Sequence, residues 1–417
     1  MRSGMSEISV AGGSATKTAG VQERGSMRIR VGAVILAAVF QVATVFYLAN
    51  SVSGGDAYTY LAIAEDWASW SALTAPGAFE SNFWPAGYPG FLALFLWAGD
   101  SQILVVRLVQ VVLAAAIALM AGRIADSVSQ RSGTITTVVV AFSPTAMWSV
   151  WAIGYELLLA FLLMAGVLLV WGSSRRSNSA WPLLGGLLLG LALLVQFRAV
   201  LAVLVLLVLV GRRAPWAASM ALLGVVLPVA AWALRSLLAV GNPAPWSANG
   251  PYNLWNGNNP EATGHNVFPL PPLPDGFSAY TEAALNWISA NPVDFLVITG
   301  KKFLYLFEPT RIVGVSDPFP GDVIASGVEY AIAGLICVGL IAFVILRLLR
   351  VQAGLKAMDV PFLFSAAYLL PNIVFIVEAR FAIPVHAILV AISVSAFLAL
   401  FRVFGERRAN KVSTPAG

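Results

Sequence analysis

Two carboxylates stand at the edges of apolar segments, where a proton-accepting group could meet a substrate. Asp56 lies in "SVSGGDAYTYLAIAEDWASW", residues 51–70, and Glu156 lies in "SVWAIGYELLLAF" between two apolar runs. Asp56 could cap the backbone of a helix or take a proton from an acceptor hydroxyl, and a capped carboxylate can do both. Glu156 is either a solvated residue at the end of a membrane span or a functional residue within it.

Basic residues also stand at the ends of apolar segments, apart from the clusters that hold most of the Lys and Arg. They are Arg198 in "LLVQFRAV", Arg235, the pair Lys301-Lys302 and Arg380 in "VEARFAIP". Each one alone is explained by snorkelling to lipid headgroups or by pairing with an acid such as Glu378. Together they predict a site for an anionic donor phosphate, because Arg and Lys are the usual phosphate partners.

The elements that must position these residues are membrane helices. Of the 417 residues, 59% are hydrophobic and only 11% are charged, which excludes an ordinary soluble protein. A span needs about 20 apolar residues, so we expect an all-α polytopic membrane protein with about ten transmembrane helices (roughly 8–12). The predicted spans are 31–51, 103–122, 134–152, 156–172, 182–197, 199–211, 216–238, 327–349, 360–378 and 382–403. The short segments 182–197 and 199–211 are either a tilted pair or a re-entrant hairpin.

The placement of positive charge predicts the orientation of the chain. Eighteen of the 25 Lys and Arg fall into clusters that ten spans would place on one side of the membrane. Because Lys and Arg are retained on the cytoplasmic side, this arrangement predicts cytoplasmic termini and a site facing outward from a bacterial cytoplasmic membrane. The predicted parts are a disordered tail (1–30), an N-terminal transmembrane module (31–239) with a catalytic first external loop (52–101), an external loop with interfacial helices (240–325), C-terminal transmembrane helices (326–404) and a cytoplasmic tail (405–417).

The external segments carry helix and sugar-binding signals. Apolar and aromatic residues at Tyr60, Ala64, Trp67 and Trp70 have helical spacing, which predicts a helix on the outer membrane surface. Two further amphipathic helices are expected near 278–290 and 292–307. The segment "NGPYNLWNGNNPEATG" is rich in Asn and aromatic residues, which suit tight turns and also suit sugar binding. The candidate sugar- or acceptor-binding residues are Tyr58, Tyr88, Asn258 and Asn259.

Several kinds of site are disfavoured by what the sequence contains. The single cysteine, Cys337, excludes an internal disulfide. The sequence contains only two histidines, His265 and His386, so a zinc site is not expected. The sequence has no nucleotide-binding motif and gives no sign of a nucleic-acid partner. No cofactor is required, although a divalent cation is compatible with the sequence.

The segments taken together resemble the GT-C membrane glycosyltransferases that use polyprenyl-phosphate sugars, a group that includes protein O-mannosyltransferases and lipid A aminoarabinose transferases. The matching segments occur in order from about residue 54 to residue 390. They are "GGDAYTYLAIAEDW", "FWPAGYPGFLALF", "AFSPTAMWSVWAIGYELLLAFLL", "GLLLGLALLVQFRAVL", "NLWNGNNPEATG", "NWISANPVDFLVITGKKFLYLF" and "EARFAIPVHAILV".

The resemblance implies that Asp56 is the general base, that Glu156 matches a second acidic position, and that Arg198 and Arg380 lie near the carrier phosphate. It also implies inversion at the anomeric carbon, a polyprenyl-phosphate sugar donor, and a glycan, lipid or protein acceptor. The chain departs from many members in two respects. It has Asp56-Ala57 where they have Asp-Glu or a fuller acidic cluster in the first loop. It also ends soon after the tenth predicted span, where they carry a large extracytoplasmic domain.

Two other functions are compatible with the sequence. A transporter or flippase for an anionic lipid or solute would also place charges near a ligand phosphate, but such proteins commonly contain internal repeats, and none is visible here. A non-catalytic assembly subunit is the third interpretation, and the presence of Asp56 argues against it.

Overall fold

The computed structural model describes residues 8–48, 52, 54–68, 84–173, 180–240, 249–266, 279–308, 322–350 and 354–412. All elements in these ranges are helices. The first half contains α1 (Ile8–Tyr47), α2 (Gly54–Ala68), α4 (Gly87–Ala93), η1 (Leu96–Ser101), α5 (Gln102–Asp126), α6 (Gln130–Ala141), α7 (Pro144–Trp151), α8 (Glu156–Ser173), α9 (Trp181–Val195) and η2 (Phe197–Ala199). The second half contains α10 (Val200–Gly211), α11 (Pro215–Val240), α12 (Gly250–Gly257), α13 (Tyr280–Ala290), α14 (Pro292–Tyr305), α15 (Asp322–Leu348), η4 (Leu355–Met358), α16 (Asp359–Val374), η5 (Ala379–Ala382) and α17 (Ile383–Val412).

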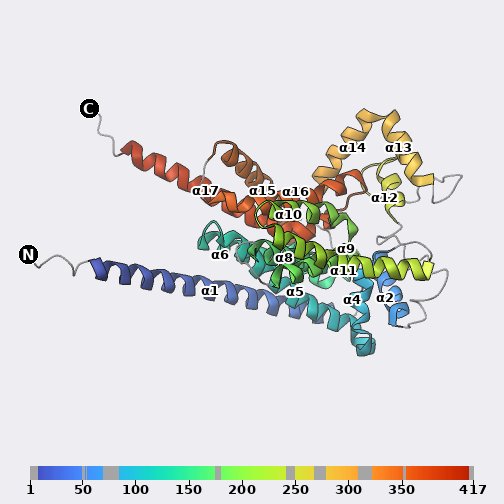
Figure 1. Ribbon diagram of the computed structural model, residues 1–417, viewed down its shortest axis with the longest axis horizontal. Coiled ribbons are helices and arrows are strands. Elements are labelled where there is room, and N and C mark those ends of the chain that lie inside the picture. The colour runs from blue at the N-terminus through green and yellow to red at the C-terminus, as the bar shows by residue number, and fades with distance from the viewer. Residues whose placement is uncertain are drawn as a thin grey trace, which may run out of the picture.

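Helix α17 is central to the bundle. It contacts α5, α6, α8, α15 and α16, and its residues Val385, Ile388 and Ile392 are fully buried. Figure 1 shows both termini at one end of the molecule and α2, α12 and α13 at the opposite end, which is called the loop end below. These three helices belong to segments predicted to be external, and they lie at the end of the molecule opposite the termini.

The expected apolar segments are all helical, but fewer helices are long enough to cross a membrane than the sequence predicts. Within the described ranges, six helices have the length and composition of a span, and the bent pair α6 and α7 could act together as a seventh. Helices α8, α9 and α10, the last together with η2, are apolar but shorter. The membrane class is supported, and the count of about ten stays a prediction.

The predicted span 134–152 is broken in the middle. Ser143 has extended backbone and its side chain accepts a hydrogen bond from the Ala146 N–H, while Pro144 occupies the first turn of α7. These are helix-start signals inside an apolar run, so α6 ends and α7 sets off at an angle of 47°.

Two helix boundaries also differ from the sequence prediction. Helix α1 extends back to Ile8, where a disordered tail over 1–30 was expected; no proline occurs between Ile8 and Tyr47 to stop it. Helix α16 ends at Val374, before the predicted end at 378, because Phe375 turns to an extended conformation. The second difference matters for the site, since it leaves a non-helical segment ahead of Arg380.

The three helices predicted in the external segments are present as α2, α13 and α14. In α2, Ala57, Tyr60 and Ala64 are buried, and the helix contacts α4 and η1. The side chains of Trp67 and Trp70 lie outside the described part of the chain, and the contact of α2 with a membrane surface stays a prediction.

Close packing of small residues joins α9 to α11. A Cβ atom placed on Gly186 would stand 2.0 Å from the carbonyl oxygen of Ala221, so the two backbones are in direct contact there. Such contacts are typical of helix pairs in membranes, where packing takes the place of the hydrophobic effect. These contacts hold α9 in place, and α9 leads directly to η2 and Arg198.

Candidate active site

A cavity of about 380 Å³ lies at the loop end and collects residues from distant parts of the sequence. Its lining includes Asp56 from α2, Arg198 from η2, Arg380 from η5, and Glu378 from the extended residues before η5. The size suits a small polar ligand. Three charged residues that the sequence analysis singled out therefore face one cavity, and Glu156 lies directly behind it.

Arg380 is the centre of the charged cluster. Its Nη2 donates to Oδ2 of Asp56 at 2.7 Å, its Nε donates to Oε2 of Glu378 at 2.5 Å, and its Nη1 lies 3.5 Å from Oε1 of Glu156. The expected pairing of Arg380 with Glu378 is present, but it is one of three. A single guanidinium thus compensates carboxylates from three separate elements.

The two predicted catalytic carboxylates differ in accessibility. The Asp56 side chain is 35% exposed, whereas that of Glu156 is 2% exposed. Asp56 lies inside the first turn of α2, two residues after its first residue, and contacts Arg380 through a side-chain oxygen. Of these two carboxylates, Asp56 is therefore the one that a ligand in the cavity can reach.

The segment 375–378, which includes Glu378 and leads to Arg380 in η5, is held in place by the loop that contains α12. The Val377 N–H donates to the Gly264 carbonyl at 3.1 Å, and Asn258 Nδ2 donates to the Val374 carbonyl at 2.8 Å. The Lys302 ammonium donates to the same Val374 carbonyl at 3.3 Å and to Oδ1 of Asn258 at 3.2 Å. We call these contacts the Lys302 clamp. They supply hydrogen-bond partners for backbone groups at and after the end of α16, which have no partner within the helix.

Arg198 has a different environment from Arg380. Its Nη1 donates to the neutral Oδ1 of Asn372 at 3.0 Å, and its guanidinium lies 4.2 Å from the centre of the Phe381 ring. No carboxylate pairs with it among the described residues. Stacking and a neutral acceptor orient the guanidinium without neutralising it, so its charge is available to an anion.

Aromatic and amide side chains complete the lining of the cavity. The Tyr60 ring packs edge-on against Trp84, at 5.5 Å between centres, and burial raises the pKa of its hydroxyl well above the usual value of 10.0, so it stays protonated. The other aromatic and amide groups are Tyr155, Tyr252, Phe381, Gln196, Asn249, Asn253 and Asn266. Rings and amides of this kind can stack on a sugar and hydrogen-bond its hydroxyls.

Other predicted site residues lie outside the lining. Tyr58 is exposed, Tyr88 is buried and donates its hydroxyl to Gln110, and Arg235 stacks on Trp232. Lys301 is exposed on α14. Lys302, Asn258 and Asn259 are fully or almost fully buried, and burial lowers the pKa of Lys302 to about 7. The sequence analysis predicted that Lys302 and Asn258 contact a ligand. In the structure they instead hold the segment that leads to Arg380.

The Asn-rich segment reaches the cavity through residues that the sequence analysis did not select. Asn249 and Asn253 are one helical turn apart at the start of α12, so they share a face with Tyr252, whereas Asn258 comes after the helix has ended. Helical spacing over 249–257 was the signal that could have identified Asn249 and Asn253. Trp84, Tyr155 and Gln196 had no comparable signal.

The residues present do not fit a divalent metal ion. The three carboxylates that would be needed surround Arg380, whose guanidinium fills the space between them. Across the described ranges, no group of three or more His, Cys, Asp or Glu side chains is arranged to hold a metal.

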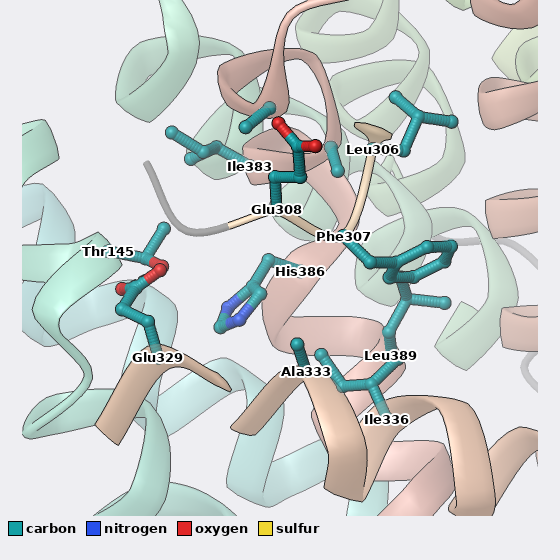
Figure 2. A pocket seen from close by; sticks show the side chains of 12 residues that line it. Thr145, Leu306, Phe307, Glu308, Glu329, Ala333, Ile336, Ile383, His386 and Leu389 are labelled. Carbon is teal, nitrogen blue, oxygen red and sulfur yellow. Dashed lines mark hydrogen bonds between the residues drawn. The ribbon is translucent and has the colours of Figure 1, made fainter. Parts of the chain in front are cut away.

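A smaller cavity of about 30 Å³ lies on the other side of η5. Ala379 and Ala382 line it, whereas Arg380 and Phe381 line the large cavity, so this short helix separates the two. Figure 2 shows the Glu329 carboxylate beside Thr145, whose hydroxyl donates to it at 2.5 Å, and the His386 imidazole within the same cavity. The volume accommodates roughly two water molecules, which is too small for a sugar.

Comparison with known proteins gives structural matches only. No protein-family model matches the sequence, and no curated protein matches it. The fold is similar to that of the Archaeoglobus fulgidus oligosaccharyltransferase tethered with an acceptor peptide containing the NVT sequon, with a TM-score of 0.52 and 14% identity, over 91% of this chain and 50% of that one. The apo form of that protein gives a TM-score of 0.51 at 13% identity, over 92% and 52%. Its complex with Zn and sulfate gives 0.51 at 13%, over 91% and 50%.

The chain spans about half the length of the solved structures that it matches, and nearly all of this chain takes part in the match. At this identity the likeness shows the fold alone, and it does not single out the O-mannosyltransferase and aminoarabinose transferase group. The chain therefore has a GT-C fold, in agreement with the class that the sequence motifs implied.

Proposed function

We propose that this chain is a membrane glycosyltransferase that transfers a sugar from a polyprenyl-phosphate donor to a hydroxyl acceptor at the outer face of a bacterial cytoplasmic membrane. The observation that carries the proposal is one cavity that joins a reachable carboxylate, Asp56, to an arginine with no acidic partner among the described residues, Arg198. The GT-C fold supports the same class of chemistry by analogy.

The proposed reaction uses the two sides of the cavity separately. Asp56 takes the proton from the acceptor hydroxyl as its oxygen attacks the anomeric carbon of the donor. The bond from that carbon to the phosphate oxygen breaks, and the electron pair leaves with the lipid phosphate. Arg198 stabilises the charge on the departing phosphate. Attack on the face opposite the leaving group inverts the anomeric carbon.

The charge of the cavity favours a donor with one phosphate. Arg380 is already surrounded by Asp56, Glu156 and Glu378, which leaves Arg198 as the cation for the donor among the described lining residues. A sugar linked through a single phosphodiester carries one negative charge at neutral pH, which one guanidinium matches. A diphosphate donor would bring more negative charge beside three carboxylates.

The direct test is transfer by the purified chain in lipid nanodiscs, with a panel of radiolabelled polyprenyl-phosphate sugars. The acceptors are glycolipids, soluble glycans and peptides, the last because the structural neighbour was solved with an acceptor peptide. We expect label to pass to one acceptor class with the wild type and not with Asp56→Asn. Movement of the lipid across the membrane of sealed proteoliposomes, with no transfer to any acceptor in nanodiscs, would instead favour the flippase alternative.

The orientation is tested separately in a Cys337→Ser background. A cysteine at Glu261, an exposed residue of the loop end, should react with an impermeant thiol reagent on intact cells. A cysteine at Arg350, an exposed residue after α15, should react only after lysis. The reverse pattern would place the site on the cytoplasmic side and would contradict the proposed donor supply.

A further inference from the structure

Each of the three nitrogens of Arg380 faces a different carboxylate. Nη2 meets Asp56 at 2.7 Å, Nε meets Glu378 at 2.5 Å and Nη1 faces Glu156 at 3.5 Å. The three acids come from α2, from the extended segment before η5, and from the first residue of α8. Elements far apart in the sequence have thus been brought together around one positive charge.

The cluster has the chemistry of a hard-cation site. Oxygen ligands from carboxylates are the groups that Mg²⁺, Ca²⁺ and Mn²⁺ prefer. Glu156 adds an independent observation, since its side chain is 2% exposed and its Oε1 accepts no hydrogen bond while it faces the centre of the cluster. A buried carboxylate oxygen in this position needs a positive partner, because an uncompensated buried charge is strongly destabilising.

We propose that the Arg380 guanidinium is the resident cation of a latent metal site, and that it excludes a divalent ion from the carboxylates of Asp56, Glu156 and Glu378. A metal ion needs its oxygen ligands within about 2.0–2.6 Å of one point. The planar guanidinium holds the three carboxylates farther apart than that, which is why they form no metal-binding group as they stand.

The arrangement has a consequence for the candidate site. Arginine remains charged at every pH in the physiological range and is attached to the chain, so the positive charge beside Asp56 does not depend on the supply of a metal. We infer that this chain keeps a cation in the carboxylate cluster through its own side chain.

The test measures Mn²⁺ binding to the full-length purified chain by the loss of the electron paramagnetic resonance signal of free Mn²⁺. We expect the wild type to bind no ion at this site and Arg380→Ala to bind one per chain. Removing one carboxylate from the variant, as in Arg380→Ala with Glu378→Gln, should abolish the gained binding. The readout does not use sugar transfer, so a failed transferase assay would not affect it.

Arg107 provides a matched control. It is fully buried, and its guanidinium donates to neutral groups, the backbone carbonyls of Trp151 and Leu48. Arg107→Ala should gain no Mn²⁺ site. Equal binding by the Arg107→Ala and Arg380→Ala variants would overturn the proposal, as would an ion in the wild type that Asp56→Asn removes.

Loss of the charge could also unfold the protein. In that case Arg380→Gln, which keeps most of the side-chain volume, is compared with the wild type in the presence and absence of Mn²⁺. We expect Mn²⁺ to raise the unfolding temperature of the variant and to leave that of the wild type unchanged. If Mn²⁺ neither binds to nor stabilises either Arg380 variant, the cluster is not a latent metal site.

Discussion

Arg380 and Lys302 are two basic residues that the sequence analysis grouped as phosphate ligands, yet they lie in opposite environments. Arg380 faces three carboxylates and lines the large cavity. Lys302 is fully buried behind the cavity, where it donates to Asn258 and to the Val374 carbonyl, both neutral. The two residues are connected through the segment 375–378, whose beginning the Lys302 clamp holds and whose end carries Glu378.

The comparison shows that a basic residue near a membrane boundary can serve the site in two ways. In the charged cluster, a cation compensates acids and contacts Asp56, the proposed base. In the clamp, an ammonium supports backbone geometry, and burial without an acidic partner lowers its pKa to about 7. Substitution of Asp56, the more exposed of the two predicted catalytic acids, should therefore change chemistry with little change in stability, and substitutions in the clamp should lower stability.

The largest expected effect is that of Asp56→Asn on transfer. Asn keeps the size of the side chain and its compatibility with the start of a helix, but it cannot accept the proton of the acceptor hydroxyl. We expect a rate lower by about 10²–10⁴-fold, with the unfolding temperature little changed, measured by initial rates and thermal unfolding in nanodiscs. Glu65→Gln, at an exposed position of α2, is the control. Normal turnover with Asp56→Asn would remove Asp56 as the base and direct attention to Glu156.

The next effect concerns donor affinity and Arg198. Replacement by alanine removes a charge-assisted contact worth about 1.5–3 kcal/mol, which corresponds to roughly 10- to 150-fold weaker donor binding. Equilibrium binding of a fluorescent polyprenyl phosphate measures it. Arg212→Ala, an arginine at the end of α10, should bind like the wild type. If both variants bind equally well, Arg198 serves only through its contacts with Asn372 and Phe381.

The sequence was most informative where a charge broke an expected pattern. Arg198 and Arg380 stood out because they opposed the placement of the other basic residues, and Asp56 and Glu156 because acids interrupt apolar surroundings. All four are at or beside the cavity. The helices were predictable for a similar reason, since long apolar runs and helical spacing depend on local sequence.

Other features depended on where helices end, which local patterns specify poorly. The break at Ser143-Pro144 lay within an apolar run that satisfied the criterion for one span. The early end of α16 made Val374 and Val377 available to the loop, and that in turn explains the burial of Asn258 and Lys302. Their roles follow from contacts between residues tens of positions apart, and no single-sequence pattern reports such contacts.

The link between clamp and cluster can be tested at Gly257. A Cβ atom at this position would stand 2.6 Å from the Phe375 carbonyl oxygen, so Gly257→Ala must displace the segment 375–378. We expect a stability loss of about 1–3 kcal/mol together with a lower transfer rate, because Glu378 and Arg380 move with that segment. The control is Gly250→Ala on the same helix, where an added Cβ meets nothing within 4 Å. If Gly257→Ala lowers the stability and leaves the transfer rate unchanged, the clamp does not position the charged cluster.

The smallest expected effect is a pH dependence of stability that comes from Lys302. In the folded chain its pKa is lowered from 10.5 to about 7, so between these values the unfolded chain binds more protons than the folded chain does. The free energy of unfolding must therefore rise with pH above about 7, and it loses this contribution as pH falls through the folded pKa. Between pH 6.5 and pH 8 the contribution is about 1 kcal/mol.

Lys302→Met removes the titrating group, so the stability of the wild type relative to this variant should increase by that amount over the same interval. Denaturation in mild detergent at the two pH values measures it, with Lys301→Met as a control for loss of an exposed ammonium from the same helix. A constant difference between wild type and Lys302→Met would mean that Lys302 keeps its charge within the clamp, and the contrast with Arg380 would then rest on their partners alone.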